Sequence, residues 1–223
     1  MNVEPLPALA AYELWAPTYP AVAHTPLMRL EQDIVEPMLA RLRATRALDV
    51  GTGSGRYLPL LASTGSTTTV GVDFSMAMLR RCGHEPRRLA CADACRLPFA
   101  RASFDVINAS LMVGDVADLQ AWTREMARVL SRGGHLVYSD FHPSWAELGW
   151  RRTFTAADGG THDLAFEPHA IDDHLRALEA ARLRVLAIRE PRFKDGPDAA
   201  IAAFRRRWGN PPVVAVFHAT QEP

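Results

Sequence analysis

The apolar positions of this chain follow two spacings in turn, one typical of helices and one of strands. From Met28 to Arg43 they recur every three to four residues, which predicts an amphipathic helix that Pro37 should kink or divide. Short apolar runs, several of them β-branched, predict strands. The predicted strands cover 47–50, 67–72, 89–91, 104–109, 135–140, 183–188 and 213–218. The other predicted helices cover 8–15, 119–130, 171–181 and 199–208, with shorter ones ending at 63 and 81.

The alternation of strands and helices predicts an α/β fold, in which helices cover both faces of a parallel sheet. The last two strands are expected to pair like a hairpin. We expect a single domain over residues 1–223. Residues 141–170 are too irregular for a core unit and read as an inserted cap. Residues 1–27 combine prolines with Tyr12, Trp15 and Tyr19, so this segment either packs on the domain or forms a lid over a ligand.

Charge and cysteine content narrow the range of partners. The 25 basic and 25 acidic residues cancel, so no strong field favours nucleic acid or an acidic membrane surface. No apolar run approaches the roughly 18–20 residues of a membrane span. The cysteines Cys82, Cys91 and Cys95 lack the further ligands of a zinc set. We therefore expect free thiols, no metal and a cytoplasmic protein without a membrane or nucleic-acid partner.

One stretch carries the main signal for a ligand. Asp49 ends a predicted strand, and Gly51, Gly53 and Gly55 follow it at every second position before a helix. Glycine lets the backbone of such a turn approach a polar ligand, near the N-terminus of the helix that follows. A glycine-rich turn without a ligand is the alternative for this stretch taken alone.

Acidic residues at the ends of successive strands favour a glycine turn that binds a ligand over one that does not. Asp49, Asp73 and Asp93 close three predicted units, and all three fall at the carboxyl edge of a parallel sheet, where ligands bind. Asp73 lies 22 positions after Gly51, which suits a carboxylate that accepts from ribose hydroxyls. Asp93 is placed to accept from an adenine amine. The spacing Gly-x-Gly-x-Gly argues against a dinucleotide, which favours Gly-x-Gly-x-x-Gly.

At this point the sequence resembles a known family, the class I S-adenosylmethionine-dependent methyltransferases, and within it the ubiquinone- and biotin-synthesis type that acts on small molecules. The resemblance covers residues 47–140, in family order and spacing. It rests on the motifs at 48–55, 71–76, 78–79, 92–94, 97–99, 103–106 and 129–134. A departure occurs at Gly114-Asp115, where many relatives carry paired histidines.

The resemblance implies a Rossmann-like three-layer αβα sandwich with a seven-stranded, mostly parallel sheet whose last strand is antiparallel. It also implies S-adenosyl-L-methionine as cofactor. Gly51 and Gly53 would lie against the methionine part, Asp73 on the ribose and Asp93 at the adenine, under a lid that includes Tyr19. The full set of implied cofactor residues is Tyr19, Asp49, Gly51, Thr52, Gly53, Asp73, Phe74, Met76, Ala92, Asp93, Ala94, Ala109 and Ser110.

Methyl transfer is an in-line displacement that depends mainly on alignment of the acceptor. A base is needed only where the acceptor must lose a proton. His142, just past the fifth core strand, is the best-placed candidate for this base, and His169 in the cap is next. Either histidine is otherwise a packing or surface residue. Trp145 and Trp150 line an aromatic acceptor pocket or form the core of the cap.

We therefore predict methylation of a small organic molecule, with O-methylation ahead of C- or N-methylation, by a monomer or homodimer. An S-adenosylmethionine-binding cyclase or isomerase of the same fold is the alternative, because a fold does not fix its chemistry. A non-catalytic binding subunit is a third reading, which the intact glycine turn disfavours.

Overall fold

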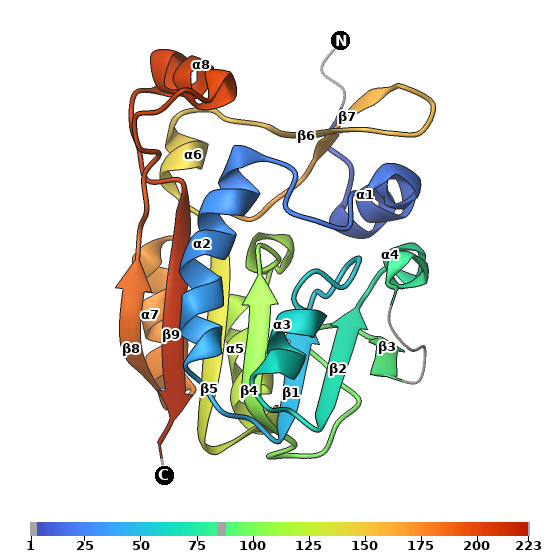
Figure 1. The fold of residues 1–223 in the computed structure, drawn as a ribbon, viewed down its shortest axis with the longest axis vertical. Helices are drawn as coiled ribbons and strands as arrows, with labels where there is room; N and C mark the ends of the chain where they lie inside the picture. The colour runs from blue at the N-terminus through green and yellow to red at the C-terminus, as the bar shows by residue number, and fades with distance from the viewer. Residues whose placement is uncertain (1–3, 84–87, 223) are drawn as a thin grey trace.

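A seven-stranded sheet forms the centre of the molecule (Figure 1). The computed structural model describes residues 4–83 and 88–222. Within them the strand order is β3-β2-β1-β4-β5-β9-β8. The strands are β1 (Arg46–Val50), β2 (Thr68–Asp73), β3 (Leu89–Cys91), β4 (Phe104–Ser110), β5 (Leu130–Phe141), β8 (Leu183–Arg189) and β9 (Val214–Gln221). The first five run parallel, and β9 is antiparallel to both β5 and β8, which confirms the expected fold class.

Helices cover the sheet on two sides and make it the middle of three layers. Helices α2 and α3 pack on one face, and α5 and α7 pack on the other (Figure 1). The helices are α1 (Ala8–Trp15), α2 (Pro26–Ala40), α3 (Leu58–Ser63), α4 (Met76–Arg81), α5 (Leu119–Val129), α6 (Ser144–Glu147), α7 (Ile171–Ala180) and α8 (Ala199–Trp208). Short 3-10 turns follow α1, at Ala16–Thr18, and β4, at Val113–Asp115. No helix of the described part of the chain is long and apolar enough to cross a membrane.

The two faces of the sheet have separate hydrophobic cores. On the α5 side, the Tyr138 ring stacks on Phe217 at 4.7 Å and meets the edge of Trp122 at 5.1 Å, and all three are buried. On the α2 side, Val35 and Leu39 are fully buried against the strands. Complete burial of such side chains contributes about 1.5–3 kcal/mol each, so these layers fix the sheet edge that carries the site.

Two local predictions differ from the structure. Helix α2 is not divided at Pro37. Since Pro37 lies on the exposed face, the carbonyl that loses its N–H partner remains open to water. The strand predicted at 135–140 begins earlier, at Leu130, because β5 takes in residues 130–134 through a shift of register against β4. Gly133 has a φ of +70° there, which relieves the strain of the irregular stretch.

The two segments expected to cover the sheet edge meet each other. The cap contains α6 and a hairpin of β6 (Arg152–Thr155) and β7 (Thr161–Leu164), which the sequence did not predict. The Leu6 N–H donates to the Asp163 carbonyl at 2.8 Å, and the Leu6 carbonyl accepts from Ala165 at 2.9 Å. Phe154 is buried and stacks on Trp15 at 5.0 Å. The N-terminal segment and the hairpin therefore form a continuous cover over one end of the sheet (Figure 1).

Candidate active site

A cavity of about 830 Å³ lies at the carboxyl ends of β1, β2 and β4. Val50, Val72 and Ser110 contribute to its floor, while Tyr19 from the N-terminal segment and Arg152 from the hairpin contribute to its roof. Ligand pockets commonly measure about 300–1,000 Å³, so this cavity has room for a nucleoside-sized ligand beside a second small molecule.

The glycine turn shapes the cavity beside β1. Gly51 and Gly53 both line it and have φ angles of +67° and +55°. A Cβ atom at Gly51 would lie 2.7 Å from the side chain of Met112, so this position has neither the conformation nor the space for another residue. The turn is anchored to the next strand, since the Thr52 N–H donates to the Val72 carbonyl at 2.9 Å.

The Asp73 carboxylate bridges the turn and the start of α4. Its Oδ2 accepts the N–H of Gly53 at 2.8 Å, and its Oδ1 accepts the N–H of Ser75 at 2.9 Å. Burial raises the pKa of Asp73 to about 6 despite these hydrogen bonds. Each oxygen keeps a further acceptor position, and the side chain lines the cavity, which suits a ligand with adjacent hydroxyls.

Asp93 occupies the end of the cavity near β3. Its Oδ1 accepts the N–H of Cys95 at 2.8 Å, which orders the loop after the strand. The side chain lines the cavity together with Ala92 and Ala94. Asp73 and Asp93 thus face the same space from neighbouring strands, as predicted from their positions at strand ends.

Asp49 stabilises the glycine turn through hydrogen bonds made outside the cavity. It accepts the Thr52 hydroxyl at 2.7 Å and the Asn108 amide at 2.8 Å. Burial raises the pKa of Asp49 to about 6. Neither Asp49 nor Thr52 lines the cavity, so the geometry gives them a supporting position rather than one against a ligand.

The implied cofactor set divides into residues that line the cavity and residues that do not. Those that line the cavity are Tyr19, Gly51, Gly53, Asp73, Phe74, Ala92, Asp93, Ala94 and Ser110. Met76 is 45% exposed on α4, and Ala109 is fully buried in the core under α5, so neither reaches the cavity.

The aromatic residues of the N-terminal segment both pack and line the cavity. Tyr12, Trp15 and Tyr19 all face it. Trp15 and Tyr19 meet edge to face at 4.8 Å, and Tyr12 lies edge-on to Phe74 at 6.2 Å. The two readings of this segment, packing and lid, are therefore compatible.

The two histidines predicted as bases lie outside the cavity. His142 Nε2 is 2.9 Å from a Glu190 oxygen, and its Nδ1 is 2.8 Å from the Ser144 hydroxyl. His169 Nε2 is 2.7 Å from the Val116 carbonyl. These contacts tie loops together and do not favour either ring as a base. His24, which the sequence did not single out, lines the cavity next to Tyr19.

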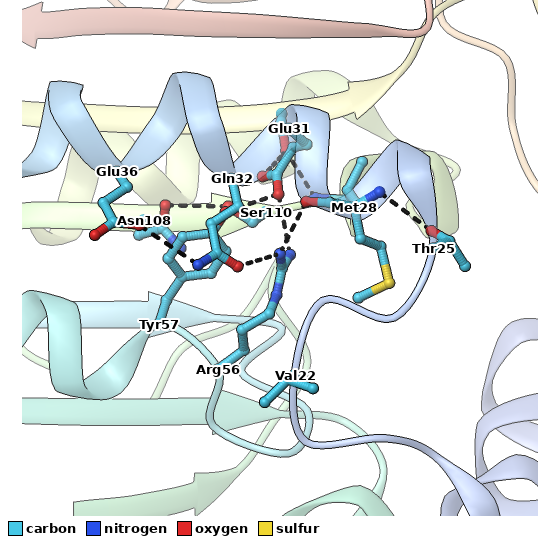
Figure 2. A network of polar contacts seen from close by, with 12 residues as sticks. Val22, Thr25, Met28, Glu31, Gln32, Glu36, Arg56, Tyr57, Asn108 and Ser110 are labelled. Atoms are coloured by element: carbon cyan, nitrogen blue, oxygen red, sulfur yellow. Dashed lines mark hydrogen bonds and ion pairs between the residues drawn. The ribbon is translucent and has the colours of Figure 1, made fainter. Parts of the chain in front are cut away.

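A buried carboxylate connects the glycine turn to α2 (Figure 2). Glu31 is fully buried, and its Oε2 lies 3.1 Å from Arg56 Nη2 and accepts the Tyr57 hydroxyl at 2.7 Å. Its Oε1 accepts the Ser139 hydroxyl of β5 at 2.8 Å. Arg56 also lines the cavity, so this network holds a cavity side chain between the turn and the helix.

A second buried ion pair joins the cover to the loop after β4. Arg152 Nη1 lies 2.6 Å from Asp115 Oδ1, and both side chains are at most 10% exposed. The Tyr12 hydroxyl donates to Asp115 Oδ2 at 3.0 Å and also contacts Arg152. Gly114, next to Asp115, donates its N–H to Asp140 at 3.0 Å. Gly114-Asp115, which stands where many relatives carry paired histidines, is therefore held by its own ion pair and hydrogen bonds.

The far end of the cavity is aromatic. Phe141, Trp145, Trp150, Phe193 and Phe204 line it from the end of β5, the cap, the loop after β8 and α8. Successive ring centroids in this group lie 4.8 to 5.3 Å apart. The cavity thus has a polar end under β1, β2 and β3 and an aromatic end under the cap.

Sequence comparison finds known proteins that are similar to this chain. Residues 48–138 match a family model described as a methyltransferase domain. A demethylmenaquinone methyltransferase of Corynebacterium urealyticum is 38% identical over 112 residues, which cover 46% of this chain and 48% of that protein. A malonyl-[acyl-carrier protein] O-methyltransferase of Methylococcus capsulatus is 32% identical over 178 residues, which cover 74% of this chain and 64% of that protein. In sequence the chain is thus similar to methyltransferases, most clearly over residues 48–138, as the motifs of the sequence led us to expect.

Solved structures agree with this family at the level of the fold. An S-adenosylmethionine-dependent methyltransferase from Mesorhizobium loti superposes with a TM-score of 0.66 at 22% identity, over 86% of this chain and 97% of that one. A chain from the complex of the Haloferax volcanii Trm112 activator with a methyltransferase gives 0.71 at 19% identity over both full lengths. The [4+2]-cyclase SpnF gives 0.59 at 17% identity over 85% and 81%.

S-adenosylmethionine is the cofactor that this similarity implies, and the polar end of the cavity fits it. Gly51 and Gly53 line this end, where the methionine part would lie. Asp73 keeps acceptor positions for the ribose hydroxyls, and Asp93 with Ala94 lies where the adenine would reach. The assignment of each residue to a part of the cofactor stays a prediction.

The residues of this site that sequence reasoning missed include Glu31, Arg152 and His24. Glu31 left a signal, because it lies three positions after Met28 and four before Val35, on the apolar face of a helix. A carboxylate in an apolar stripe implies a buried partner. Arg152 begins a strand of only four residues and His24 lies in a loop, so neither belongs to a pattern long enough to be recognised in the sequence.

Proposed function

We propose that this methyltransferase transfers a methyl group from S-adenosylmethionine to a hydroxyl oxygen of a small organic molecule. A single observation carries the proposal: one cavity joins a polar end, with Asp73 and Asp93, to an aromatic end, with Trp145 and Trp150. A methyl donor at the first end and an acceptor at the second would share one water-poor space. The chain spans about half the length of the demethylmenaquinone methyltransferase that it matches, so its acceptor is part of the proposal.

The residues of the chain would align and enclose the reactants. When bound, the cofactor supplies an electrophilic methyl group on a sulfonium centre. Asp73 and the glycine turn would hold its nucleoside and methionine parts, and Tyr19 would cover them. We further propose residues 1–27 as the lid and 141–170 as the substrate cap of one domain. Closing both over the cavity would exclude water and bring the acceptor into line, which is the main source of catalysis in a displacement of this kind.

O-methylation requires that the acceptor hydroxyl lose its proton. His24 supports this part of the proposal, because its ring lines the cavity and its Nδ1 faces the Val22 carbonyl at 3.4 Å. That contact leaves Nε2 as the nitrogen available to take a proton. His142 and His169, which the sequence suggested for this role, are held in contacts outside the cavity.

The test is methyl transfer from cofactor with a deuterated methyl group to a panel of phenols, carboxylic acids and amines. A product that gains one labelled methyl group on oxygen supports the proposal. Conversion of a substrate without a labelled product and without consumption of the cofactor would point instead to a cyclase or isomerase. Replacement of His24 by Ala should lower the rate with phenols, and His142→Ala is the matched control outside the cavity. Equal rates in wild type and His24→Ala would remove His24 from the mechanism.

A further inference from the structure

The aromatic end of the cavity is built as a continuous wall. Trp150 lies 5.3 Å from Phe141 and 4.8 Å from Trp145, and Phe204 lies 4.9 Å from Trp145 and 5.0 Å from Phe193. Trp145 donates its indole N–H to the Val213 carbonyl at 2.7 Å, so its polar atom is satisfied behind the wall. The surface offered to a ligand is therefore ring face and edge, which favours another flat ring.

The cavity-lining arginine that contacts this wall is already neutralised. The Arg152 guanidinium lies 4.9 Å from the centre of the Phe141 ring. Its Nη1 lies 2.6 Å from Asp115, and both side chains are at most 10% exposed. Arg56, which also lines the cavity, lies 3.1 Å from the buried Glu31. Arg96, the remaining arginine among the described residues that line the cavity, is exposed beside Asp93 at the polar end.

We infer that the aromatic wall binds an uncharged aromatic ring of the methyl acceptor, and that Asp115 makes the subsite reject acids by cancelling the charge of Arg152. A carboxylate placed beside the wall would leave water without gaining a free cation as partner, which is costly. A neutral phenol carries no such cost and gains the ring contacts. This inference names the acceptor class and rests on the function proposed above.

The first experiment compares two probes with the same ring system at pH 7, neutral 1-naphthol and anionic 1-naphthoate. Binding to the 223-residue chain is followed by calorimetry with S-adenosylhomocysteine present. We expect 1-naphthol to bind at least about tenfold more tightly, which corresponds to roughly 1.4 kcal/mol. Equal or tighter binding of 1-naphthoate overturns the inference.

The second experiment removes the cancelling charge. Asp115→Asn keeps the shape of the side chain and leaves Arg152 without its anion, so binding of 1-naphthoate should tighten at least tenfold while 1-naphthol changes less than threefold. If the variant retains 1-naphthol binding and gains nothing for 1-naphthoate, Asp115 is not the source of selectivity and the inference fails.

A third comparison stands independently of whether Asp115→Asn folds. Trp150→Leu removes a ring from the wall and should weaken 1-naphthol binding at least fivefold. Trp208→Leu on α8 is the matched control, since Trp208 is half-buried but does not line the cavity. Equal effects of the two substitutions would place the ring elsewhere and contradict the inference.

Failure of this inference is distinct from failure of the proposed function. Loss of the proposed function would appear as no binding of S-adenosylhomocysteine, or no labelled product with any acceptor. Failure of the inference alone would appear as normal cofactor binding and methylation, with 1-naphthoate bound as well as 1-naphthol.

Discussion

Glu31 Oε2 lies 3.1 Å from Arg56 Nη2, although 25 positions separate the two residues in the chain. The carboxylate belongs to α2, which covers the sheet, and the guanidinium belongs to the glycine turn, which lines the cavity (Figure 2). The same carboxylate receives hydroxyls from Tyr57 and Ser139. One buried anion therefore connects the covering helix, the turn and the end of β5, so that the cavity wall and the helix are fixed relative to each other.

Replacing Glu31 by Gln should lower the free energy of unfolding by about 3 kcal/mol, because Arg56 loses its buried counter-charge. Denaturant titration measures the change. Glu36→Gln is the control on the same helix, at an exposed position, and should change stability by less than about 0.5 kcal/mol. A small effect of Glu31→Gln would mean that the two hydroxyls alone hold α2 in place.

Gly51→Ala should destabilise the fold and abolish cofactor binding, because the new Cβ meets Met112 at 2.7 Å in a backbone with a φ of +67°. Gly149→Ala separates the two causes. Gly149 has a φ of +68°, and a Cβ added there would have nothing within 4 Å, so this substitution should cost only the backbone strain of about 1–2 kcal/mol. Thermal unfolding and calorimetry with S-adenosylhomocysteine measure both effects. Similar behaviour of the two variants would exclude the Met112 contact as the reason for glycine.

Asp73→Asn should weaken the binding of S-adenosylhomocysteine by roughly 10- to 100-fold, the range expected when an ionised hydrogen-bond acceptor is lost. Calorimetry measures the dissociation constant. Asp33→Asn, an exposed position on α2, removes the same charge far from the polar end and should leave affinity unchanged. Unchanged affinity in Asp73→Asn would refute the assignment of this residue to the ribose.

Cofactor affinity should depend on pH through the same residue. Burial raises the pKa of Asp73 to about 6, so the carboxylate proposed to accept from the ribose is mostly formed at pH 7 and mostly protonated at pH 5. Affinity should therefore fall roughly tenfold from pH 7 to pH 5, which follows from the fraction ionised. In Asp73→Asn the affinity should be low and nearly flat over this range. The same slope in both proteins would assign the titration to another group.

His174 should make the fold sensitive to acid. Burial, with a smaller effect of nearby His169, lowers the pKa of His174 from 6.5 to about 3. The unfolded chain therefore binds a proton at His174 below pH 6.5 that the folded chain refuses until about pH 3, and the free energy of unfolding falls as the pH drops between these values. Because buried carboxylates such as Asp140 contribute with the opposite sign, the difference between wild type and His174→Gln is the quantity to measure. This difference should shrink on acidification, and a constant difference would rule out His174.

Local sequence pattern predicts most of the helices and strands and part of the candidate site. It gives the boundaries of α1 to the residue and the strand ends that carry Asp73 and Asp93 within one position, because periodicity and β-branching act over a few neighbours. It does not predict partners that are distant in the chain. The bond between Tyr12 and Asp115 spans 103 positions, and no pattern near either residue encodes it.

His142 shows the same limit, because local pattern predicts its position in the chain but not the direction of its side chain. Its place after β5 suggests that it faces the ligand edge. The ring instead contacts Glu190, 48 positions later, so the direction of the side chain is decided by a loop that the position of the strand does not determine. The hairpin of the cap escapes prediction for a related reason, since its two four-residue strands are stabilised against the N-terminal segment rather than by the main sheet.

The backbone bonds of Leu6 to Asp163 and Ala165 have a kinetic consequence. Thr18 also donates to the Thr155 carbonyl at 3.3 Å, so the N-terminal segment is fastened to both strands of the hairpin. Neither piece can swing away from the sheet without breaking these bonds or carrying the other with it. If these segments are the proposed lid and cap, release of the spent cofactor and exchange of the acceptor would depend on the same opening, and a single rate would limit both.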